Sequence, residues 1–454
     1  MKKIVYLLSF LLLAAPFTAC TSDDDTSIDS ETSDDSQENT DDETISSESL
    51  IDKYPDGINS DIPVMETYTL TATGQTILYD NDGNIITALS EGDDYYGQDG
   101  SYQAGAQMSY INNGDGTITD NNTGLMWQQI PSSESFTWEE AKDYCENLTL
   151  GGYDDWRMPS TKELYSISNF QTGWPYIDTD FFNLVLEGQV SKDEQYWSSI
   201  LYVGQATEQS MGMTPPGQDS ETGSTEGTLP PPSFDSDDTE STDGFQPKAF
   251  GVNYGTGHIK AYAANAGGPI GGNYVRAVRG NRYGENNFTD NGDETITDSS
   301  TGLMWAKNDC ETPMEWKEAL KYAEESTLAG YDDWRLPNVK ELQNIVDYDY
   351  SPSAVDESKQ GPAINPIFNC TKIENEAGDE DYGYYWTSTS ARFQSGTAMC
   401  YAWYVAFGRA VGGDGIDVHG AGAVRYDTKY EGGDLGEGGE RYYNYVRLVR
   451  NTNK

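Results

Sequence analysis

Apolar residues recur along this chain at two different spacings, and the same order of spacings occurs twice. Turn residues and short β-branched runs alternate over 113–127, which predicts a β-hairpin. Over 137–148 the apolar residues instead fall on one face at the 3.6-residue period of an α-helix. The same two patterns return over 291–305 and 312–323. The pattern therefore predicts a mixed α+β architecture that the chain builds twice.

The two copies match most closely at an octet that is Gly-Tyr-Asp-Asp-Trp-Arg-Met-Pro at 152–159 and Gly-Tyr-Asp-Asp-Trp-Arg-Leu-Pro at 330–337. Around the octets, the match runs without a gap from 113–164 to 291–342, at a constant offset of 178 residues. This period is too long for a solenoid, whose repeats span ~20–50 residues. It indicates tandem globular domains.

The chain divides into five predicted segments. They are a signal peptide over 1–19, a lipidated cysteine with a disordered acidic tether over 20–52, a small β-rich region over 53–107 that packs against the first repeat, domain one over 108–281 with a disordered insert at about 205–246, and domain two over 286–452. The insert contains no Lys or Arg and is rich in Pro, Gly and acidic residues, which is typical of disorder.

Each domain is predicted to contain two short helices with identifiable start signals. The segment 137–140 is a capping box, in which a threonine and a glutamate satisfy backbone N–H groups at the helix start. The segment 312–315 predicts a different start, with Pro313 at the first helical position. Cap signals for the second helices follow the octets, at Ser160 with Glu163 and at Asn338 with Glu341.

The N-terminus is predicted to direct export. Two lysines precede an apolar stretch over 4–17 that is too short to span a bilayer, which is typical of a signal peptide. The segment 17–20, Phe-Thr-Ala-Cys, resembles a lipobox in which Cys20 would be lipidated; the alternative is an ordinary secretory signal. The tract 21–50 contains no Lys or Arg, which predicts a solvated tether or, in its first acidic residues, an export signal for the outer face of the outer membrane. We expect an outer membrane lipoprotein, exposed at the cell surface and held to the membrane through its lipid anchor only.

The charge of the chain disfavours polyanionic partners. The 76 acidic and 27 basic residues give a formal net charge of -49, so the summed field repels nucleic acid, anionic lipid headgroups and sulfated polysaccharides. We expect no nucleic-acid partner. The two histidines, His258 and His419, lie outside the shared part of the repeat. Their placement argues against His-based catalysis in both domains and against a repeated His-ligated metal site.

Each octet places a carboxylate pair beside a tryptophan and an arginine. These residues are Asp154, Asp155, Trp156 and Arg157, and Asp332, Asp333, Trp334 and Arg335. Two carboxylates near an arginine can act as a general acid and base. No nucleophile or imidazole recurs beside them, so we favour a structural role in which Arg157 and Arg335 form bidentate pairs with an aspartate or with chain carbonyls. Trp127 and Trp305 belong to the same structural motif, and we predict no catalytic residue.

Aspartates in the hairpin turns are weak candidates for calcium ligands. They are Asp115, Asp120, Asp293 and Asp298. The turns lack the spaced ligands and the terminal glutamate of an EF-hand loop, so turn formation is the favoured interpretation and a metal site is the alternative. We expect no cofactor, with calcium as the open alternative.

The later part of each repeat is predicted to be β-structure. Trp197 and Trp386 lie in short β-prone runs, and each domain closes on a Val/Arg strand, 275–279 and 446–450. We interpret the basic closing strand as a solvated or ion-paired edge rather than as a ligand site.

Four cysteines follow Cys20, and an exported chain can oxidise them. They are Cys145, Cys310, Cys370 and Cys400, for which three pairings exist. Because Cys370 and Cys400 both lie in the second half of domain two, we prefer a bridge between them. Cys145 lies on the predicted core face of its helix and is expected to be a buried thiol.

Together these motifs resemble the Lcl C-terminal domain family. They are Asn-Gly-Asp-Gly-Thr-Ile-Thr-Asp, Thr-Gly-Leu-Met-Trp, Trp-Glu-Glu-Ala, the octet, Lys-Glu-Leu, Trp-Ser-Ser and the closing Val-Arg-x-Val-Arg, and they cover about 108–281 and 286–452. The resemblance implies an α+β fold with two tandem C-type-lectin-like domains, each with two short helices and a mainly antiparallel sheet, related also to the formylglycine-generating-enzyme group. It implies surface attachment, because the adhesin domain that names the family binds sulfated glycosaminoglycans. The paired active-site cysteines of the related enzymes have no repeated counterpart here, which argues against catalysis by that route.

These observations predict a non-catalytic, surface-exposed lipoprotein, an adhesin or ligand-binding protein that recognises extracellular glycan through loops rich in Tyr and Trp. Aromatic faces suit the C–H surfaces of sugars. The alternative is a structural component that binds protein partners in a cell-surface or fimbria-like assembly, which a large flat apolar patch would favour. An enzyme is the third interpretation, and it would need an acid/base pair in a deep pocket.

Overall fold

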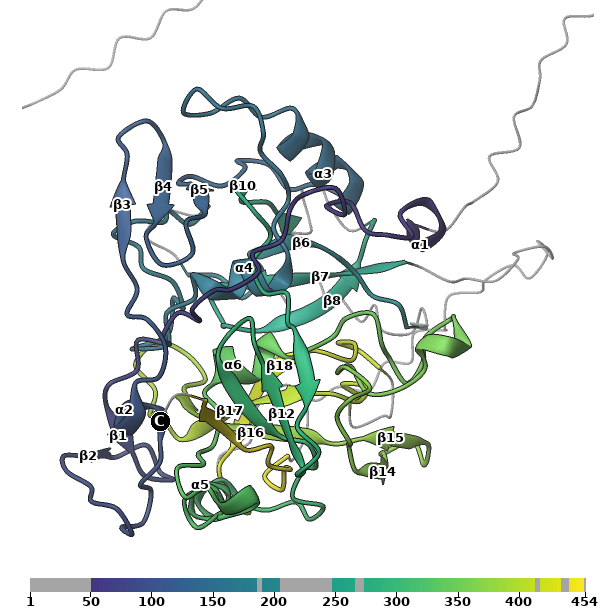
Figure 1. Ribbon diagram of the computed structural model, residues 1–454. Coiled ribbons are helices and arrows are strands. Elements are labelled where there is room, and N and C mark those ends of the chain that lie inside the picture. The colour runs from purple at the N-terminus through teal and green to yellow at the C-terminus, as the bar shows by residue number, and fades with distance from the viewer. Residues whose placement is uncertain are drawn as a thin grey trace, which may run out of the picture. The chain divides into compact units, whose positions relative to one another are not determined.

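The computed structural model describes most of the chain beyond residue 49. The described residues are 50–185, 190–204, 247–265, 273–412, 417–433 and 441–452. Both repeats belong to one compact unit, residues 48–454 (Figure 1). Cys20, the predicted signal peptide, the insert and the tether up to residue 49 lie outside the described residues. The last residues of the predicted tether, 50–52, are helical.

The helices of the described residues are short. They are α1 Leu50–Lys53, α2 Asp99–Tyr102, α3 Trp138–Glu146, α4 Thr161–Ser166, α5 Trp316–Glu324 and α6 Val339–Asn344, with 3-10 turns at Leu328–Gly330 and Glu357–Lys359. Each repeat therefore contributes two α-helices, α3 and α4 or α5 and α6, as the sequence predicts. Among the described helices, none has the length and apolar character needed to cross a bilayer.

Each repeat begins and ends in the same kind of four-stranded antiparallel sheet. The strand order is β10-β5-β4-β3 in the first repeat and β19-β13-β12-β11 in the second. The strands are β3 Tyr110–Asn112, β4 Thr117–Asp120, β5 Met126–Gln128, β10 Val278–Arg279, β11 Phe288–Asp290, β12 Thr295–Asp298, β13 Leu303–Ala306 and β19 Val449–Asn451. The closing strand pairs with the predicted hairpin, Val278 opposite Trp127 and Val449 opposite Trp305. The hairpins are confirmed, and the ends of each repeat lie together.

A seven-stranded sheet joins the two repeats, in the order β16-β17-β18-β8-β7-β6-β9. Its strands are β6 Gln195–Leu201, β7 Lys248–Asn253, β8 Ile259–Ala263 and β9 Asn273–Tyr274 from the first repeat, and β16 Tyr384–Ala391, β17 Tyr401–Ala406 and β18 Val424–Thr428 from the second. The repeats meet where β8 pairs antiparallel with β18, Ile259 opposite Val424 (Figure 1). The sequence predicts a sheet within each domain, whereas here two edge strands pair and so remove two exposed edges.

Three of the four predicted helix starts are confirmed. Thr137, Ser160 and Asn338 each cap a helix in a complete capping box. The fourth prediction is wrong, because α5 begins at Trp316 and Pro313 lies before the helix. The backbone N–H of Met314 instead donates to the carbonyl of a residue near the closing strand, at 2.9 Å. The segment before α5 is thus held by a strand-like contact rather than by helical turns.

Buried side chains form one cluster common to both repeats and one smaller cluster in each. Trp127 and Trp305 are fully buried in the common cluster. The smaller clusters surround the helix tryptophans, Trp138 in α3 and Trp316 in α5. Each of these indole N–H groups donates at 2.8 Å to a backbone carbonyl of the long strand of its repeat, β6 or β16. The helix is therefore fixed to the shared sheet in the same way in both repeats.

The N-terminal region packs against both repeats rather than against the first alone. Its hairpin consists of β1 Leu78–Tyr79 and β2 Ile85–Ile86, and the second repeat adds the hairpin β14 Lys372–Glu374 and β15 Glu380–Tyr382. The Tyr54 ring lies edge-on to Trp138 at 5.5 Å, and the Tyr95 ring lies 6.5 Å from Trp316. Gln75 Oε1 accepts a hydrogen bond from a backbone N–H of β16 at 2.8 Å. The region thus covers the first helix of each repeat.

The cysteines do not form the predicted bridge. Among the described residues, Cys370 and Cys400 are not joined by a disulfide, and neither Cys145 nor Cys310 is bridged. Cys370 instead lies beside Arg447, whose Nη2 donates to its Sγ at 3.4 Å. Cys145 is buried on α3, and burial raises the pKa of its thiol. Placement in the same half of a repeat was therefore no guide to pairing, because it does not set the separation of two side chains.

Candidate functional site

The arginine of each octet is half of a buried ion pair. Arg157 donates to Glu163 from Nη1 at 2.7 Å and from Nη2 at 2.6 Å. Arg335 makes the same two contacts with Glu341, both at 2.6 Å. Each glutamate also accepts a hydrogen bond from the backbone N–H of its helix-cap residue, at 2.8 and 2.9 Å. The pair is bidentate, but its partner is the capping glutamate rather than an aspartate, so it connects the octet to the start of the second helix. The predicted contact with chain carbonyls is present for Arg157, whose Nη2 donates to the carbonyl of Gly280 at 3.1 Å.

The second aspartate of each octet pairs with an arginine of the closing strand. Asp155 Oδ1 accepts from Arg279 Nε at 2.6 Å, and Asp333 Oδ1 accepts from Arg450 Nε at 2.6 Å. The hydrogen bond from Arg279 lowers the pKa of the Asp155 carboxyl. In both copies the octet tyrosine stacks on this guanidinium, 3.8 Å from its central carbon to the ring centroid. The two copies therefore build the same Tyr-Arg-Asp stack.

The other octet residues divide between surface and core. Asp154 and Asp332 are exposed, whereas Trp156 and Trp334 are buried. Each buried indole N–H donates to a backbone carbonyl just before its octet, at 3.2 Å and 3.0 Å. Within each octet one carboxylate thus faces solvent while its neighbour is held by an arginine. The structure does not bring the two together as an acid and base.

The closing strand is predicted to be a solvated or ion-paired edge. The first arginine of this strand is instead buried in both repeats. Arg276 and Arg447 are 0% exposed. Arg276 Nη1 donates to the backbone carbonyls of Gln128 at 2.8 Å and Gln129 at 2.5 Å. Arg447 Nη1 donates to two equivalent carbonyls, at 3.0 and 2.9 Å. These guanidinium groups satisfy chain carbonyls beside the small sheet, which is a structural task.

The hairpin aspartates bind their own turns. They are Asp115, Asp120, Asp293 and Asp298, and each accepts from a backbone N–H and from a threonine hydroxyl that follow it closely in the chain. The threonine contacts lie at 2.6–2.8 Å. Among the described residues, no group of three or more His, Cys, Asp or Glu side chains is placed to hold a metal ion. The turn interpretation accounts for the contacts of these carboxylates.

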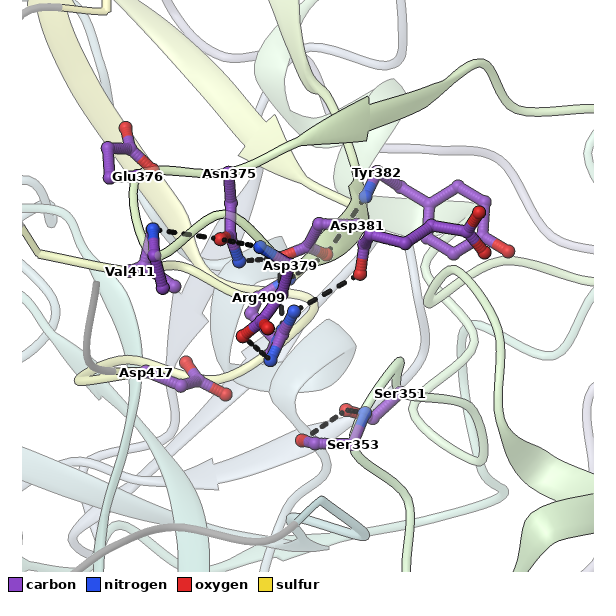
Figure 2. A network of polar contacts seen from close by, with 12 residues as sticks. Ser351, Ser353, Asn375, Glu376, Asp379, Asp381, Tyr382, Arg409, Val411 and Asp417 are labelled. Atoms are coloured by element: carbon purple, nitrogen blue, oxygen red, sulfur yellow. Dashed lines mark hydrogen bonds and ion pairs between the residues drawn. The ribbon is translucent and has the colours of Figure 1, made fainter.

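Figure 2 shows polar residues that gather in the second repeat, and two of them, Asp417 and Ser351, also contact the first repeat. Asp381 accepts from the backbone N–H of Arg409 and from its Nε, both at 3.0 Å. Tyr202 of the first repeat donates to Asp417 Oδ2 at 2.5 Å, and its hydroxyl lies 3.0 Å from Ser351 Oγ. Burial raises the pKa of the Asp417 carboxyl. The Tyr202 contacts thus join the residue that follows β6 to the second repeat.

Both histidines lie at the pairing of the two repeats. The His258 ring stacks on Tyr426 of β18, with centroids 4.9 Å apart and an interplanar angle of 21°. The carbonyl of His419 accepts a backbone N–H of β8 at 2.8 Å. Burial, together with the charges of Lys260 and Arg425, lowers the pKa of both imidazoles well below the ordinary value. Both rings are therefore neutral at physiological pH.

An open groove of about 450 Å³ lies along α3 of the first repeat. Phe136 and Tyr144 supply its aromatic lining, with ring centroids 5.3 Å apart and an interplanar angle of 32°. Glu140, Asp143 and Asn147 line it as exposed polar residues. The groove thus combines adjacent aromatic rings with hydrogen-bonding groups at its border.

Hydrogen bonds fix the Tyr144 hydroxyl and the backbone of Phe136. Tyr144 OH accepts a hydrogen bond from Gln128 Nε2 at 2.7 Å. The Phe136 carbonyl accepts from Trp197 Nε1 at 2.8 Å, and its N–H donates to a carbonyl of β9 at 2.8 Å. The sequence places binding on variable loops, whereas the groove lies on a helix and the residues before it. The one sequence feature that points to this groove is an aromatic residue, Tyr144, next to the predicted apolar face of the helix.

The corresponding surface of the second repeat differs in chemistry. At the constant offset, Met314 replaces Phe136, Lys321 replaces Asp143, Ser326 replaces Leu148, and Tyr322 keeps the tyrosine. The Tyr322 side chain is 40% exposed. Lys321 Nζ lies 3.7 Å from a carboxylate oxygen of Glu325. The second repeat therefore presents a single tyrosine beside an ion pair instead of two adjacent rings.

Comparison with known protein families finds the same family in both repeats. The model of the Lcl C-terminal domain family matches residues 116–279 and again residues 294–450. The two matches together span more than half of the chain and coincide with the two repeats. No curated protein and no solved structure match the chain.

Proposed function

The chain belongs to the Lcl C-terminal domain family, and on that basis we propose that it is a non-catalytic protein that binds extracellular glycan through the groove on α3. The observation that carries the proposal is the pair of adjacent rings, Phe136 and Tyr144, whose centroids lie 5.3 Å apart beside an open groove. Aromatic faces pack against the C–H faces of sugars. A tyrosine ring that is fixed through its hydroxyl, and a phenylalanine whose backbone is fixed, lose little conformational freedom on binding.

The size and border of the groove suit a short stretch of glycan. Its volume of about 450 Å³ lies in the ~300–1,000 Å³ range of small-molecule sites. Glu140, Asn147 and Thr149 border it and can accept or donate hydrogen bonds to sugar hydroxyls. An apolar wall with a few polar groups gives both contact area and orientation.

We extend the proposal to the fold and to the place of action. Each repeat is assigned a C-type-lectin-like fold, supported by two helices, an antiparallel sheet and a closing strand that returns to the first hairpin. The protein is proposed to be an outer membrane lipoprotein at the cell surface, anchored through Cys20. The motif at 17–20 and the acidic tract that follows support this assignment. Mass spectrometry of the mature N-terminus tests it: a diacylated Cys20 is expected, and an unmodified N-terminus would contradict it.

A glycan array of the purified chain tests the binding function. We expect a restricted set of glycans to bind, and Phe136→Ala and Tyr144→Ala each to reduce those signals. The matched controls are Met314→Ala and Tyr322→Ala, at the equivalent positions of the second repeat, which are expected to leave the signals unchanged. The array is run with calcium and with chelator. Binding that the chelator abolishes would support the alternative that the aspartate turns bind calcium.

A blank array in both conditions would contradict glycan binding. Binding that survives both groove substitutions would move the site elsewhere on the protein. Circular dichroism and thermal unfolding of each variant establish that a lost signal is not a lost fold. With a blank array, cross-linking at the cell surface would then test the structural role in a protein assembly.

A further inference from the structure

We infer that the α3 groove prefers glycans that carry free, protonated amino groups, such as de-N-acetylated amino sugars, and that it rejects sulfated ones. The inference rests on the proposed function, because it names the class of glycan that the same groove takes. It comes from two carboxylates, Glu140 and Asp143, that line the groove about one helical turn apart, together with its aromatic residues.

The carboxylate of Glu140 is only partly engaged by the protein. Its Oε2 accepts the backbone N–H and the hydroxyl of Thr137, both at 2.9 Å. Those two contacts belong to the capping box and fix the direction of the side chain. Among the described residues, no hydrogen bond is donated to Oε1. An oxygen held at the border of the groove is therefore available to a ligand.

The carboxylate of Asp143 has only a distant cationic partner within the protein. Its closest cation is Lys142, at 3.6 Å from Nζ to Oδ1, and the Asp143 side chain is 71% exposed. Lys142 Nζ lies closer to Glu146 Oε2, at 2.6 Å. The nearest positive charge is thus directed toward another carboxylate. The border of the groove carries net negative charge.

Charge complementarity then selects the ligand. A protonated amine on a sugar stacked against Tyr144 can donate to one of the two carboxylates. A sulfate in the same place would face two like charges and the field of a chain with a formal net charge of -49. An N-acetyl group is neutral, so its N–H can donate only an ordinary hydrogen bond in addition to the stacking contact. We expect affinity to fall in the order amine, N-acetyl, sulfate.

The second repeat offers a natural contrast. Lys321 stands at the position of Asp143, and Glu325 stands at the position of Asn147. The equivalent surface therefore carries two carboxylates, Glu318 and Glu325, and one cation that lies 3.7 Å from Glu325, so its net negative charge is smaller. No ammonium preference is expected there. Glu318→Gln is therefore a matched control for Glu140→Gln, and both lie on exposed helix positions.

Calorimetric titration of the full chain with three oligosaccharides tests the inference. They are a glucosamine tetramer, its fully N-acetylated form and an O-sulfated N-acetylated form, at a mildly acidic pH that protonates the amines. Because an exposed ion pair contributes up to about a fivefold change in affinity, we expect the amine form to bind about fivefold tighter than the N-acetylated form. No binding of the sulfated form is expected.

Two conservative variants report on the carboxylates alone. Glu140→Gln keeps the capping box, since glutamine serves at that position, and Asp143→Asn keeps the side-chain shape. Each is expected to reduce the amine preference, the ratio of the affinities for the amine and N-acetylated tetramers, by about twofold to fivefold. Glu318→Gln is expected to change neither affinity.

The outcomes separate this inference from the proposed function. Equal affinity for the amine and N-acetylated forms, with no effect of Glu140→Gln or Asp143→Asn, would overturn the inference and leave glycan binding intact. Failure of both unsulfated tetramers to bind would overturn the inference, and only together with a blank glycan array would it also overturn the proposed function. Binding of the amine form that Tyr144→Ala does not weaken and that salt abolishes would be attraction to the overall charge, and would also overturn the inference.

Discussion

The two repeats share their buried polar contacts and differ on the outer face of the first helix. In the interior, Arg157 with Glu163 and Arg335 with Glu341 have bidentate contacts within about 0.1 Å of each other. On the surface, the first repeat has a pair of rings, Phe136 and Tyr144, where the second repeat has a single tyrosine beside a lysine. A buried ion pair is costly to alter one residue at a time, whereas an exposed position changes at little cost. The comparison teaches that the octet maintains the fold and that the helix surface is where the repeats specialise.

Loss of the octet arginine is the largest effect that we expect. Arg157→Ala or Arg335→Ala leaves a buried, charged glutamate without its partner, which should lower the free energy of unfolding by about 3–5 kcal/mol. Urea unfolding of the two variants measures it, and the comparison predicts similar losses in both repeats. The double variant Arg157→Ala/Glu163→Gln removes the stranded charge but keeps the cap, so it should recover part of the loss. A loss below about 1 kcal/mol in either repeat would show that the two pairs are not equivalent.

Stability should rise between about pH 7 and pH 9. Burial lowers the pKa of Lys340 and Lys429 from 10.5 to about 7, and it lowers the pKa of His258 and His419 below 6.5. Between about pH 7 and 10.5 for the lysines, and below 6.5 for the histidines, the unfolded chain binds more protons than the folded one. Each lysine should therefore add about 2 kcal/mol of stability between about pH 7 and pH 9. Urea unfolding at several pH values measures the slope.

A pair of matched substitutions sharpens this prediction. Lys340 and Lys162 occupy the same position in the two repeats, and burial lowers the pKa of both. Lys340→Met and Lys162→Met should each reduce the pH slope above neutrality. Asp99 acts in the opposite sense at acidic pH, because burial raises its pKa to about 6 and its contribution is lost as the pH rises through that value. A wild-type stability that falls between about pH 7 and pH 9 would contradict the assignment.

Removal of one groove ring should weaken glycan binding without affecting the fold. Tyr144→Ala is expected to lower the affinity for an array-positive glycan about tenfold, equivalent to about 1.4 kcal/mol. Tyr322→Ala removes the equivalent ring of the second repeat and should leave that affinity unchanged. Equal losses in the two variants would mean that both repeats bind, and would end the functional distinction between them.

The smallest effect should come from the two tyrosines by which the N-terminal region covers the repeats. Tyr54→Leu and Tyr95→Leu keep apolar bulk and remove a ring contact, which should cost about 0.5–1 kcal/mol each. The Tyr54 ring lies closer to its tryptophan, 5.5 Å against 6.5 Å, so its loss should be the larger. Thermal unfolding compares them. The reverse order would show that the second repeat depends more on its cover than the first.

The local elements of each repeat could be predicted because their signals are local. The capping boxes at Thr137, Ser160 and Asn338 each consist of residues three places apart, and all three form. The start at Pro313 was mistaken, because a proline fits a first helical turn but does not by itself create one. The sequence places the groove tyrosine, Tyr144, within a predicted helix. Its neighbour in the groove, Phe136, precedes the helix, so helical periodicity does not relate the two rings.

Taken by itself, the amino-acid sequence determined that the chain contains one α+β unit twice, where the first hairpins lie, and where three of the four repeat helices begin, since these follow from periodicity, turn chemistry and cap spacing. Only the tertiary structure decided that Arg157 pairs with Glu163 and Asp155 with Arg279, that β8 and β18 merge two sheets, and that two rings line one groove. The physical reason is the separation along the chain between the residues that interact. Hydrogen bonds within a turn or cap are set by neighbours along the chain, whereas side-chain partners depend on which surfaces the folded repeats bring within a few ångströms.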